Sequence, residues 1–204
     1  MAKTSLYSVH PGVRLTTHWT ATLKPKTGRS FEEWLELIKS SGPAAEAERV
    51  AWLKTAHNLG TNSAVGLAAR AGGKGGELAD PQEYLRAAEG YVEGMYSGPK
   101  AALRPIYDAL LKLGLRLGPD VKACPCQTIV PLYRKHVFAQ LKPTTRTRID
   151  LGLALGARPP EGRLIDTGGY AKKDRITHRI PISSLKEIDA EVKQWLRTAY
   201  KEDQ

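Results

Sequence analysis

Basic side chains are concentrated in one stretch of this 204-residue sequence, and their types would suit the binding of anions. Residues 121–182 carry 12 Lys and Arg against 4 Asp and Glu, so most of the net charge of +10 lies there. Seven of the twelve are arginines, whose planar forks fit phosphate and carboxylate groups. The same count could describe a face kept basic for solubility. The charge therefore favours an anionic partner such as nucleic acid without identifying it.

The first concentration of cations lies in two consecutive segments that we expect to be strands. Alternation over residues 133–142 places five side chains on one face: Arg134, His136, Phe138, Gln140 and Lys142. Arg146 and Arg148 follow directly, among three threonines. Antiparallel pairing of the two strands would bring these cations and one aromatic ring together, as a surface for phosphates and stacked bases. Asp150 could equally pair with one arginine and leave the others solvated.

A second basic patch lies in the glycine-containing segment 168–175, where Tyr170 precedes three cations. As a loop it could close on a ligand, or it could be an exposed connection rich in lysine. The predicted anion-binding set is then Arg134, His136, Lys142, Arg146, Arg148, Lys172, Lys173 and Arg175. The alternative is a small-molecule pocket between helices and sheet, lined by Tyr133, Phe138, Tyr170 and Trp195.

Metal and nucleophile chemistry has little support in the sequence. Cys124 and Cys126 could join His136 as zinc ligands, but a fourth ligand is not evident. A disulfide across one residue would be strained, so we expect buried or partly buried thiols. The five histidines lie apart, and none stands beside a nucleophile and an acid. We therefore predict no catalytic residues, no metal and no cofactor, and an enzyme is the third possibility.

Composition also bears on the compartment of the protein. No run of apolar residues is long enough to span a membrane, and the first residues lack the apolar run of a signal peptide. Two cysteines cannot build a disulfide framework. These features predict a cytoplasmic protein without a membrane partner.

Helices dominate the expected first half of the chain. Ser30 and Glu33 form a capping box for a helix that ends near residues 41–43, whereas residues 13–23 could be extended. Further helices are expected over 44–56 and 61–70. The last of these resembles a recognition helix, but its side chains are too apolar for a major-groove reader.

The second half is predicted to mix helices and strands. Asp80 and Pro81 start one helix, and the next contains Pro105, which kinks it unless the helix begins later. Strands are expected over 122–129, 133–142, 148–155 and 175–182, before a last helix capped by Ser184. The fold class is α+β: a small helical N-terminal domain, 1–76, followed by an antiparallel-sheet domain flanked by helices, 80–204.

Short phrases resemble two bacterial families of domains of unknown function. Residues 6–13 (LYSVHPGV), the TGRS phrase at 27–30 and WLK at 52–54 resemble the helical family 4287. The phrases CPC at 124–126, IVPLYR at 129–134 and HVFAQ at 136–140 resemble the α+β family 5655. Within 62–70 the chain departs from the first family, because a bulkier, aromatic-containing helix would be expected.

The resemblance implies no activity, because neither family has an established one. Domains of the second type resemble ones found beside predicted nucleases, which favours a nucleic-acid setting. Together with the charge, this predicts non-catalytic binding of nucleic acid or another polyanion through the basic C-terminal domain. The alternative is a small-molecule-binding protein.

Overall fold

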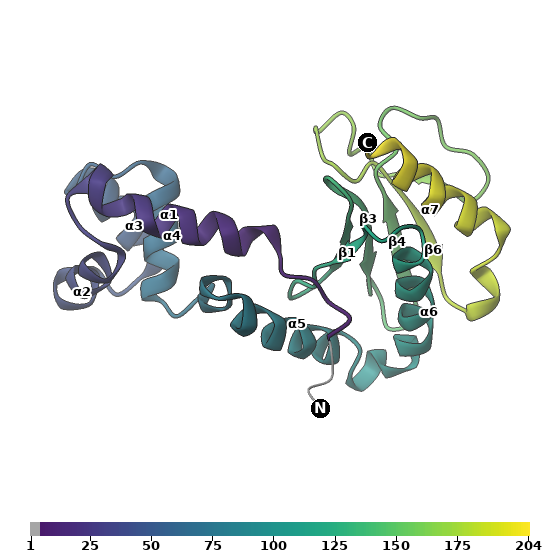
Figure 1. Ribbon diagram of the computed structural model, residues 1–204, viewed down its shortest axis with the longest axis horizontal. Coiled ribbons are helices and arrows are strands. Elements are labelled where there is room, and N and C mark those ends of the chain that lie inside the picture. The colour runs from purple at the N-terminus through teal and green to yellow at the C-terminus, as the bar shows by residue number, and fades with distance from the viewer. Residues whose placement is uncertain (1–4) are drawn as a thin grey trace. The chain divides into compact units, whose positions relative to one another are not determined.

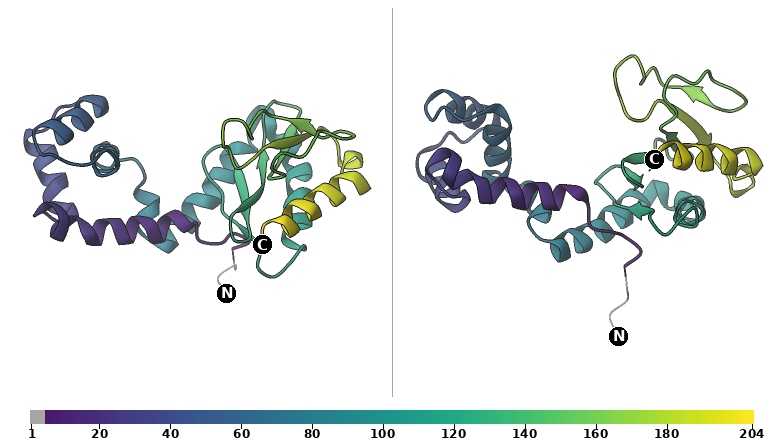
Figure 2. Two further views of the ribbon diagram at one scale, coloured as in Figure 1. Left: turned by 90° about the horizontal axis from the view of Figure 1, so that it is seen from above. Right: turned by 45° about the horizontal axis from the view of Figure 1, so that its top comes forward.

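The computed structural model describes residues 5–204, which divide into two compact units. One unit, Val9–Tyr84, is called the helical unit below. The other, called the sheet unit, combines residues 5–8 with Leu85–Gln204. Figures 1 and 2 show the elements of both units, each of which is described by itself.

The helical unit is built from α-helices and one short 3-10 helix. Its core joins Leu23, Trp34, Ile38, Leu53 and Leu67, all nearly or fully buried. The elements, in chain order, are α1 (Pro11–Thr27), α2 (Phe31–Ser41), α3 (Glu46–Thr55), α4 (Thr61–Ala71) and η1 (Gly76–Ala79).

The extended segment expected over 13–23 is wrong, because these residues belong to α1. Pro11 occupies the first turn, where its missing N–H is no loss, and the His10 Nδ1 atom accepts a hydrogen bond from the Gly12 N–H at 2.9 Å. A histidine cap is an unusual start signal, and four threonines in this stretch favour strand. Burial of Val13 and Leu23 on one side of the helix outweighs that local preference.

Other predicted helix starts in this half are confirmed. The Glu33 N–H donates to the Ser30 hydroxyl at 3.2 Å, and the Ser30 N–H donates to the Glu33 carboxylate at 2.6 Å. This is the expected capping box of α2. Helix α4 packs its apolar side into the core through Ala64, Leu67 and Ala68, as expected of a helix with so few polar groups.

Helices of the sheet unit are α5 (Pro81–Met95), most of which belongs to it, α6 (Arg104–Leu115) and α7 (Ala190–Glu202), with the 3-10 helices η2 (Gly98–Leu103) and η3 (Leu185–Glu187). Asp80 caps α5 as predicted, because its carboxylate accepts the N–H groups of Gln82 and Glu83. Pro105 lies in the first turn of α6, so the later start is the correct alternative. The predicted Ser184 cap is wrong, since Asp189 caps α7.

The sheet has the order β1-β2-β3-β4-β6-β5, and all pairs are antiparallel. The α+β fold class is therefore confirmed. The strand expected over 133–142 is interrupted, because residues 134–136 form a tight turn in which the Arg134 N–H donates to the His136 carbonyl. The strands are β1 (Lys122–Ala123), β2 (Val130–Tyr133), β3 (Val137–Lys142), β4 (Ile149–Leu153), β5 (Ile165–Asp166) and β6 (His178–Ile182).

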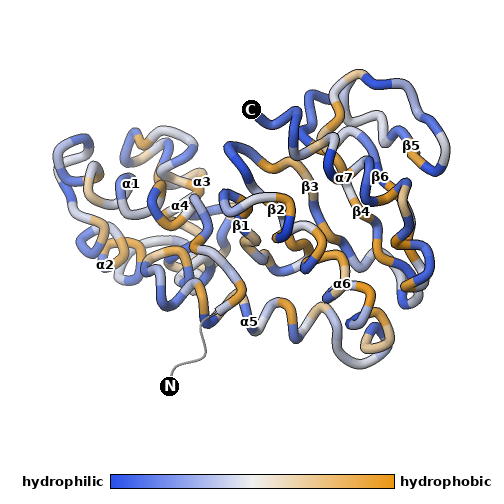
Figure 3. Tube along the Cα trace, turned by 45° about the vertical axis from the view of Figure 1, so that its right-hand side comes forward, coloured by the Kyte–Doolittle hydropathy of each residue, from blue (hydrophilic) through white to orange (hydrophobic). Residues whose placement is uncertain are grey.

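One face of the sheet forms the core of this unit together with α6 and α7. Register pairs Val130 with Leu141 and Leu151 with Ile180 across the strands, and all four side chains are fully buried. Figure 3 shows hydrophobic segments along α6 and the central strands. The opposite face carries polar residues in register, among them Lys142 beside Asp150. Within residues 5–204, the helices lack the length and apolar character needed to cross a membrane.

Candidate functional site

Most arginines of the basic stretch form ion pairs inside the sheet unit. Within the described chain, six of the seven in residues 121–182 do so, which leaves Arg146 as the exception. Such guanidinium groups are already matched to carboxylates and are less available to a ligand. The pairs are Arg134–Asp120, Arg148–Asp150, Arg179–Asp150, Arg158–Glu202, Arg163–Asp189, Arg163–Glu191 and Arg175–Asp203.

The eight predicted anion-binding residues fall into two groups at opposite ends of β3. At one end the β2–β3 turn lies beside the loop after β5, and this group contains Arg134, His136, Lys172, Lys173 and Arg175. At the other end the β3–β4 loop carries Lys142, Arg146 and Arg148. A strand of this length separates its ends by about 20 Å, because each residue adds about 3.3 Å. The structure therefore does not bring the eight residues together.

A buried carboxylate holds two members of the first group. Asp203, whose side chain is 1% exposed, accepts the His136 N–H at 2.8 Å and lies 3.1 Å from the His136 Nδ1 atom. Arg175 pairs with the same carboxylate and donates through Nε to the Val137 carbonyl at 2.9 Å. His136 and Arg175 thus hold the C-terminal end of α7 against β3 through Asp203. The sequence alternation did not predict this structural role.

Arg134 has a similar structural role at the β2–β3 turn. Its Nε atom lies 2.8 Å from Asp120, and its guanidinium stacks 4.5 Å from the centre of the Tyr200 ring. The Tyr200 hydroxyl donates to the other oxygen of Asp120 at 2.7 Å. The hydrogen bonds from Arg134 and then from Tyr200 lower the pKa of Asp120. The three side chains close a compact network between the turn and α7.

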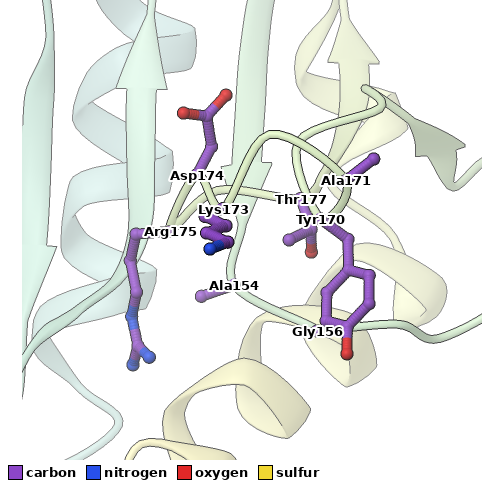
Figure 4. A pocket seen from close by; sticks show the side chains of 8 residues that line it. All are labelled: Ala154, Gly156, Tyr170, Ala171, Lys173, Asp174, Arg175 and Thr177. Carbon is purple, nitrogen blue, oxygen red and sulfur yellow. The ribbon is translucent and has the colours of Figure 1, made fainter.

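A first hollow, the loop hollow, lies under the segment 168–175 and measures about 700 Å³. In Figure 4, Tyr170 and Arg175 lie on opposite sides of it with Lys173 between them. Tyr170 is 61% exposed, and Asp174 brings a negative charge to the same lining. The charges of the loop hollow are therefore mixed, and one of its cations, Arg175, is bound to Asp203.

A second hollow, the basic hollow, measures about 620 Å³ and is lined by two cations of the other end, Lys142 and Arg146, together with Lys100. Its lining includes three cations and no carboxylate. The Lys100 ammonium donates to the Pro143 carbonyl at 2.6 Å, which joins η2 to the β3–β4 loop. Such a concave, positively charged surface with hydroxyl and amide groups is suited to an anion. Its polar side chains are Ser97, Lys100, Gln127, Thr128, Lys142, Thr144 and Arg146.

Arg148 follows Arg146 in the same loop, but its guanidinium group pairs with a carboxylate and does not line the basic hollow. Its Nε atom is 2.9 Å from Asp150, a carboxylate that also lies 3.3 Å from Arg179 and accepts the Thr144 hydroxyl at 2.8 Å. The alternative, in which Asp150 pairs with one arginine and the others are solvated, holds only in part. Asp150 pairs with both Arg148 and Arg179, and most of the other arginines pair with other carboxylates. Arg146, two residues earlier, stays exposed and lines the hollow.

The four residues of the alternative small-molecule pocket do not line one hollow together: of the four, only Tyr170 lines the loop hollow, and none lines the basic hollow. Phe138 is fully buried and its ring packs edge-on against Tyr200, so it cannot stack on a ligand, and Trp195 is buried in the core. Tyr133 is half-buried, and burial raises its pKa to about 12. Tyr170 belongs to the loop hollow.

The cysteine side chains are buried or half-buried thiols, as predicted. Burial raises the pKa of the Cys124 thiol to about 12, and the Cys126 thiol donates to the Cys124 carbonyl at 3.8 Å.

His178 is a core histidine, whose ring nitrogens lie 2.8 Å from the Thr177 hydroxyl and 2.8 Å from the Arg158 carbonyl. Among residues 5–204, His, Cys, Asp and Glu form no group of three that could hold a metal ion.

Lys100 is the main site residue that sequence reasoning missed. It lies 42 positions before Lys142, in the short helix η2, and neither alternation nor a motif connects the two. Gln127 and Thr128 follow β1 and were also missed. The packing of η2 beside the β3–β4 loop brings Lys100 to Lys142 and Arg146, and the pairing of β2 with β3 brings Gln127 and Thr128 to the same end.

Two family models match the chain in the order that the sequence resemblance predicted. The one described as "Domain of unknown function (DUF4287)" matches residues 17–71, and "Domain of unknown function (DUF5655)" matches residues 92–202. Comparison with curated proteins and with solved structures gave no match. Because the second model covers more than half of its residues, the chain belongs to the DUF5655 family and carries a DUF4287 domain before it.

Proposed function

We propose that the sheet unit binds nucleic acid, or another polyanion, without catalysing a reaction on it. The observation that carries the proposal is the basic hollow, in which Lys100, Lys142 and Arg146 line one concavity that contains no carboxylate. Within residues 121–182, the six arginines other than Arg146 are paired with carboxylates. The hollow therefore gathers three cations in a lining that contains no carboxylate to neutralise them.

Charge outside the hollow supports the same function. Residues 85–204 carry 21 Lys and Arg against 13 Asp and Glu, an excess that attracts a polyanion from a distance. Lys172 and Lys173 are exposed in the loop after β5, and no ion pair of the described residues includes either of them. A polymer can contact both ends of β3, about 20 Å apart, whereas a small anion reaches only one.

Polar groups beside the cations support phosphate as the contacted group. Phosphate oxygens are bound in nucleic-acid complexes by Lys, Arg, hydroxyl and amide donors. Thr128 and Gln127 are exposed at the edge of the basic hollow and add such donors next to Lys142 and Arg146. Tyr170, at the other end of the sheet, offers an exposed ring on which a base of a single strand can stack.

The proposal is tested by fluorescence anisotropy with labelled single-stranded and double-stranded oligonucleotides over a series of salt concentrations. Affinity should fall steeply with salt, and the double variant Lys142→Gln/Arg146→Gln should reduce the log–log slope by about 0.7 to 0.9 for each phosphate that the protein no longer neutralises. Absence of binding at low salt, or affinity that does not change with salt, contradicts the proposal.

A charge-matched control comes from α7. Lys193 and Lys201 are exposed, and no ion pair of the described chain includes them. The variant Lys193→Gln/Lys201→Gln removes the same two charges away from the basic hollow. It should lower affinity only slightly, because it weakens long-range attraction alone. An equal decrease in both double variants would show that net charge, and not the hollow, carries the binding.

A further inference from the structure

We propose that the basic hollow takes a phosphate monoester, either the phosphorylated end of a nucleic-acid strand or a mononucleotide. This inference rests on the proposed function and names the chemical group at its centre. Three features carry it: the charge of the hollow, its concave shape and the donors that remain available in its lining.

The charge of the hollow fits a monoester better than a backbone phosphate. A phosphodiester carries a single negative charge, whereas a phosphate monoester carries about −1.5 to −2 near pH 7 and exposes three acceptor oxygens. Lys100, Lys142 and Arg146 contribute three positive charges to one lining without a carboxylate. Asp150, which lies in register with Lys142, is turned to Arg148 and Arg179 and is largely buried.

The three cations come from three different parts of the fold. Lys100 lies in η2. Its hydrogen bond to the Pro143 carbonyl uses one ammonium proton and leaves two for a ligand. Lys142 ends β3, and Arg146 extends from the β3–β4 loop. A volume of about 620 Å³ lies within the range of small-molecule sites and exceeds what an isolated phosphate fills.

Hydroxyl and amide groups of the lining divide into used and available donors. The Ser97 hydroxyl donates to the Gly94 carbonyl and the Thr144 hydroxyl donates to Asp150, so neither is free to donate to a phosphate. Thr128 and Gln127 are exposed and supply the neutral donors of the site. A terminal phosphate would thus contact three cations and two neutral side chains.

The loop hollow lacks this combination. Asp174 belongs to its lining, and Arg175 is committed to the buried Asp203. A dianion there would meet one carboxylate and only one uncommitted cation, Lys173. The monoester site is therefore assigned to the basic hollow, and the loop hollow serves as the comparison.

The experiment compares three oligonucleotides of one sequence, which carry no terminal phosphate, a 5′-phosphate or a 3′-phosphate. Anisotropy at fixed ionic strength should show one phosphorylated form binding about tenfold more tightly than the unphosphorylated form, the ratio expected for at least one added charge-assisted hydrogen bond. The preference should weaken from pH 7.5 to pH 5.5, because the second pKa of the monoester is about 6.

Two variants that remove equal charge locate the effect. Lys142→Gln/Arg146→Gln should abolish the preference for the phosphorylated end. Lys172→Gln/Lys173→Gln should weaken binding of all three oligonucleotides and keep the preference. Thermal unfolding of each variant checks that the fold is retained, and AMP and inorganic phosphate are added as competitors to separate a nucleotide from a free phosphate.

Each outcome decides between the two proposals. Equal affinity for all three oligonucleotides overturns the monoester site and leaves polyanion binding intact. Binding of AMP without binding of any oligonucleotide supports the monoester site and overturns the polymer function. If neither AMP nor any oligonucleotide binds at low salt, both proposals fail. Persistence of the preference in Lys142→Gln/Arg146→Gln places the monoester elsewhere and overturns the assignment.

Discussion

Arg146 and Arg148 lie two residues apart in the β3–β4 loop, yet only Arg148 is held by a carboxylate, with its Nε atom 2.9 Å from Asp150. No ion pair of the described residues includes Arg146, which lines the basic hollow. Two cations that are equivalent in the sequence therefore have different roles. One stabilises the β3–β4 loop, and the other is available to a ligand.

This difference predicts unequal effects of two alanine substitutions on stability. Arg148→Ala should lower the free energy of unfolding by about 1 to 2 kcal/mol, because Asp150 keeps Arg179 and Thr144 but is deprived of its closest cation. Arg146→Ala should change stability by less than about 0.5 kcal/mol, as expected for an exposed side chain. Urea unfolding followed by circular dichroism measures both values.

Binding of oligonucleotides should show the reverse order. Arg146→Ala should reduce the salt slope by about one phosphate contact, whereas Arg148→Ala should leave it nearly unchanged once the folded fraction is taken into account. A larger loss of affinity in Arg148→Ala than in Arg146→Ala, at equal folded fraction, would contradict this prediction. It would show that pairing with Asp150 does not prevent Arg148 from binding the ligand.

An acid network at the start of α7 predicts how stability depends on pH. Hydrogen bonds from the Arg163 backbone N–H at 2.7 Å and from its side chain at 2.9 Å lower the pKa of Glu191. A carboxyl whose pKa is lowered on folding stabilises the protein above its usual pKa. That contribution disappears as the pH falls through the lowered pKa of the folded state.

Glu191→Gln should therefore flatten the decrease of stability on acidification. Urea midpoints at pH 7 and pH 3.5 should differ less in this variant than in the unsubstituted protein. Glu161→Gln is the matched control, since Glu161 is exposed and belongs to no ion pair of the described chain. An identical pH dependence of Glu191→Gln and the unsubstituted protein would show that Arg163 does not stabilise the charged carboxyl.

Local signals predicted two helix caps correctly, and they failed where tertiary contacts decide. The Ser30–Glu33 capping box and the Asp80 cap depend on residues three positions apart, so the sequence predicts them directly. The turn at residues 134–136 interrupts an alternating segment, because Arg134 and His136 are fixed by Asp120 and Asp203. Asp203 lies 67 positions from His136, and no local pattern connects them.

The candidate site was predictable only in part for the same reason. Alternation correctly indicated that Lys142 belongs to a polar face, and the pairing of Asp150 with arginine was foreseen as an alternative. Net charge could not separate cations that are matched to acids from those that are not. That distinction requires the positions of the carboxylates, most of which come from α7 and the two residues that flank it.

Burial of Cys124 predicts that its thiol reacts slowly in the folded protein. A pKa of about 12, raised by burial, reduces the thiolate fraction near pH 8 by roughly a thousandfold relative to an ordinary cysteine. In the variant Cys126→Ser, iodoacetamide should modify Cys124 slowly under native conditions and rapidly in urea. Mass spectrometry measures the rates, and fast native modification would contradict the buried position.

Close packing between α6 and β2 predicts opposite signs for two glycine-to-alanine substitutions. A Cβ atom at Gly114 would lie 2.5 Å from the Cδ1 atom of Leu132, which is fully buried and has no space into which to move. The free-energy cost of overpacking should exceed the gain in helix propensity, so Gly114→Ala should lower the free energy of unfolding by about 1 to 2 kcal/mol. At Gly90 in α5, no atom outside the helix's own backbone and the neighbouring residues lies within 4 Å of the added Cβ. Gly90→Ala should therefore raise the free energy of unfolding by about 0.5 to 1 kcal/mol.

A double variant identifies the contact responsible. Leu132→Val removes the methyl group that Gly114→Ala would meet, so the two substitutions together should cost less than the sum of their separate effects. Urea unfolding of the four proteins gives this coupling free energy. Strict additivity would show that Gly114 is constrained by something other than Leu132, since independent sites add whereas residues in contact do not.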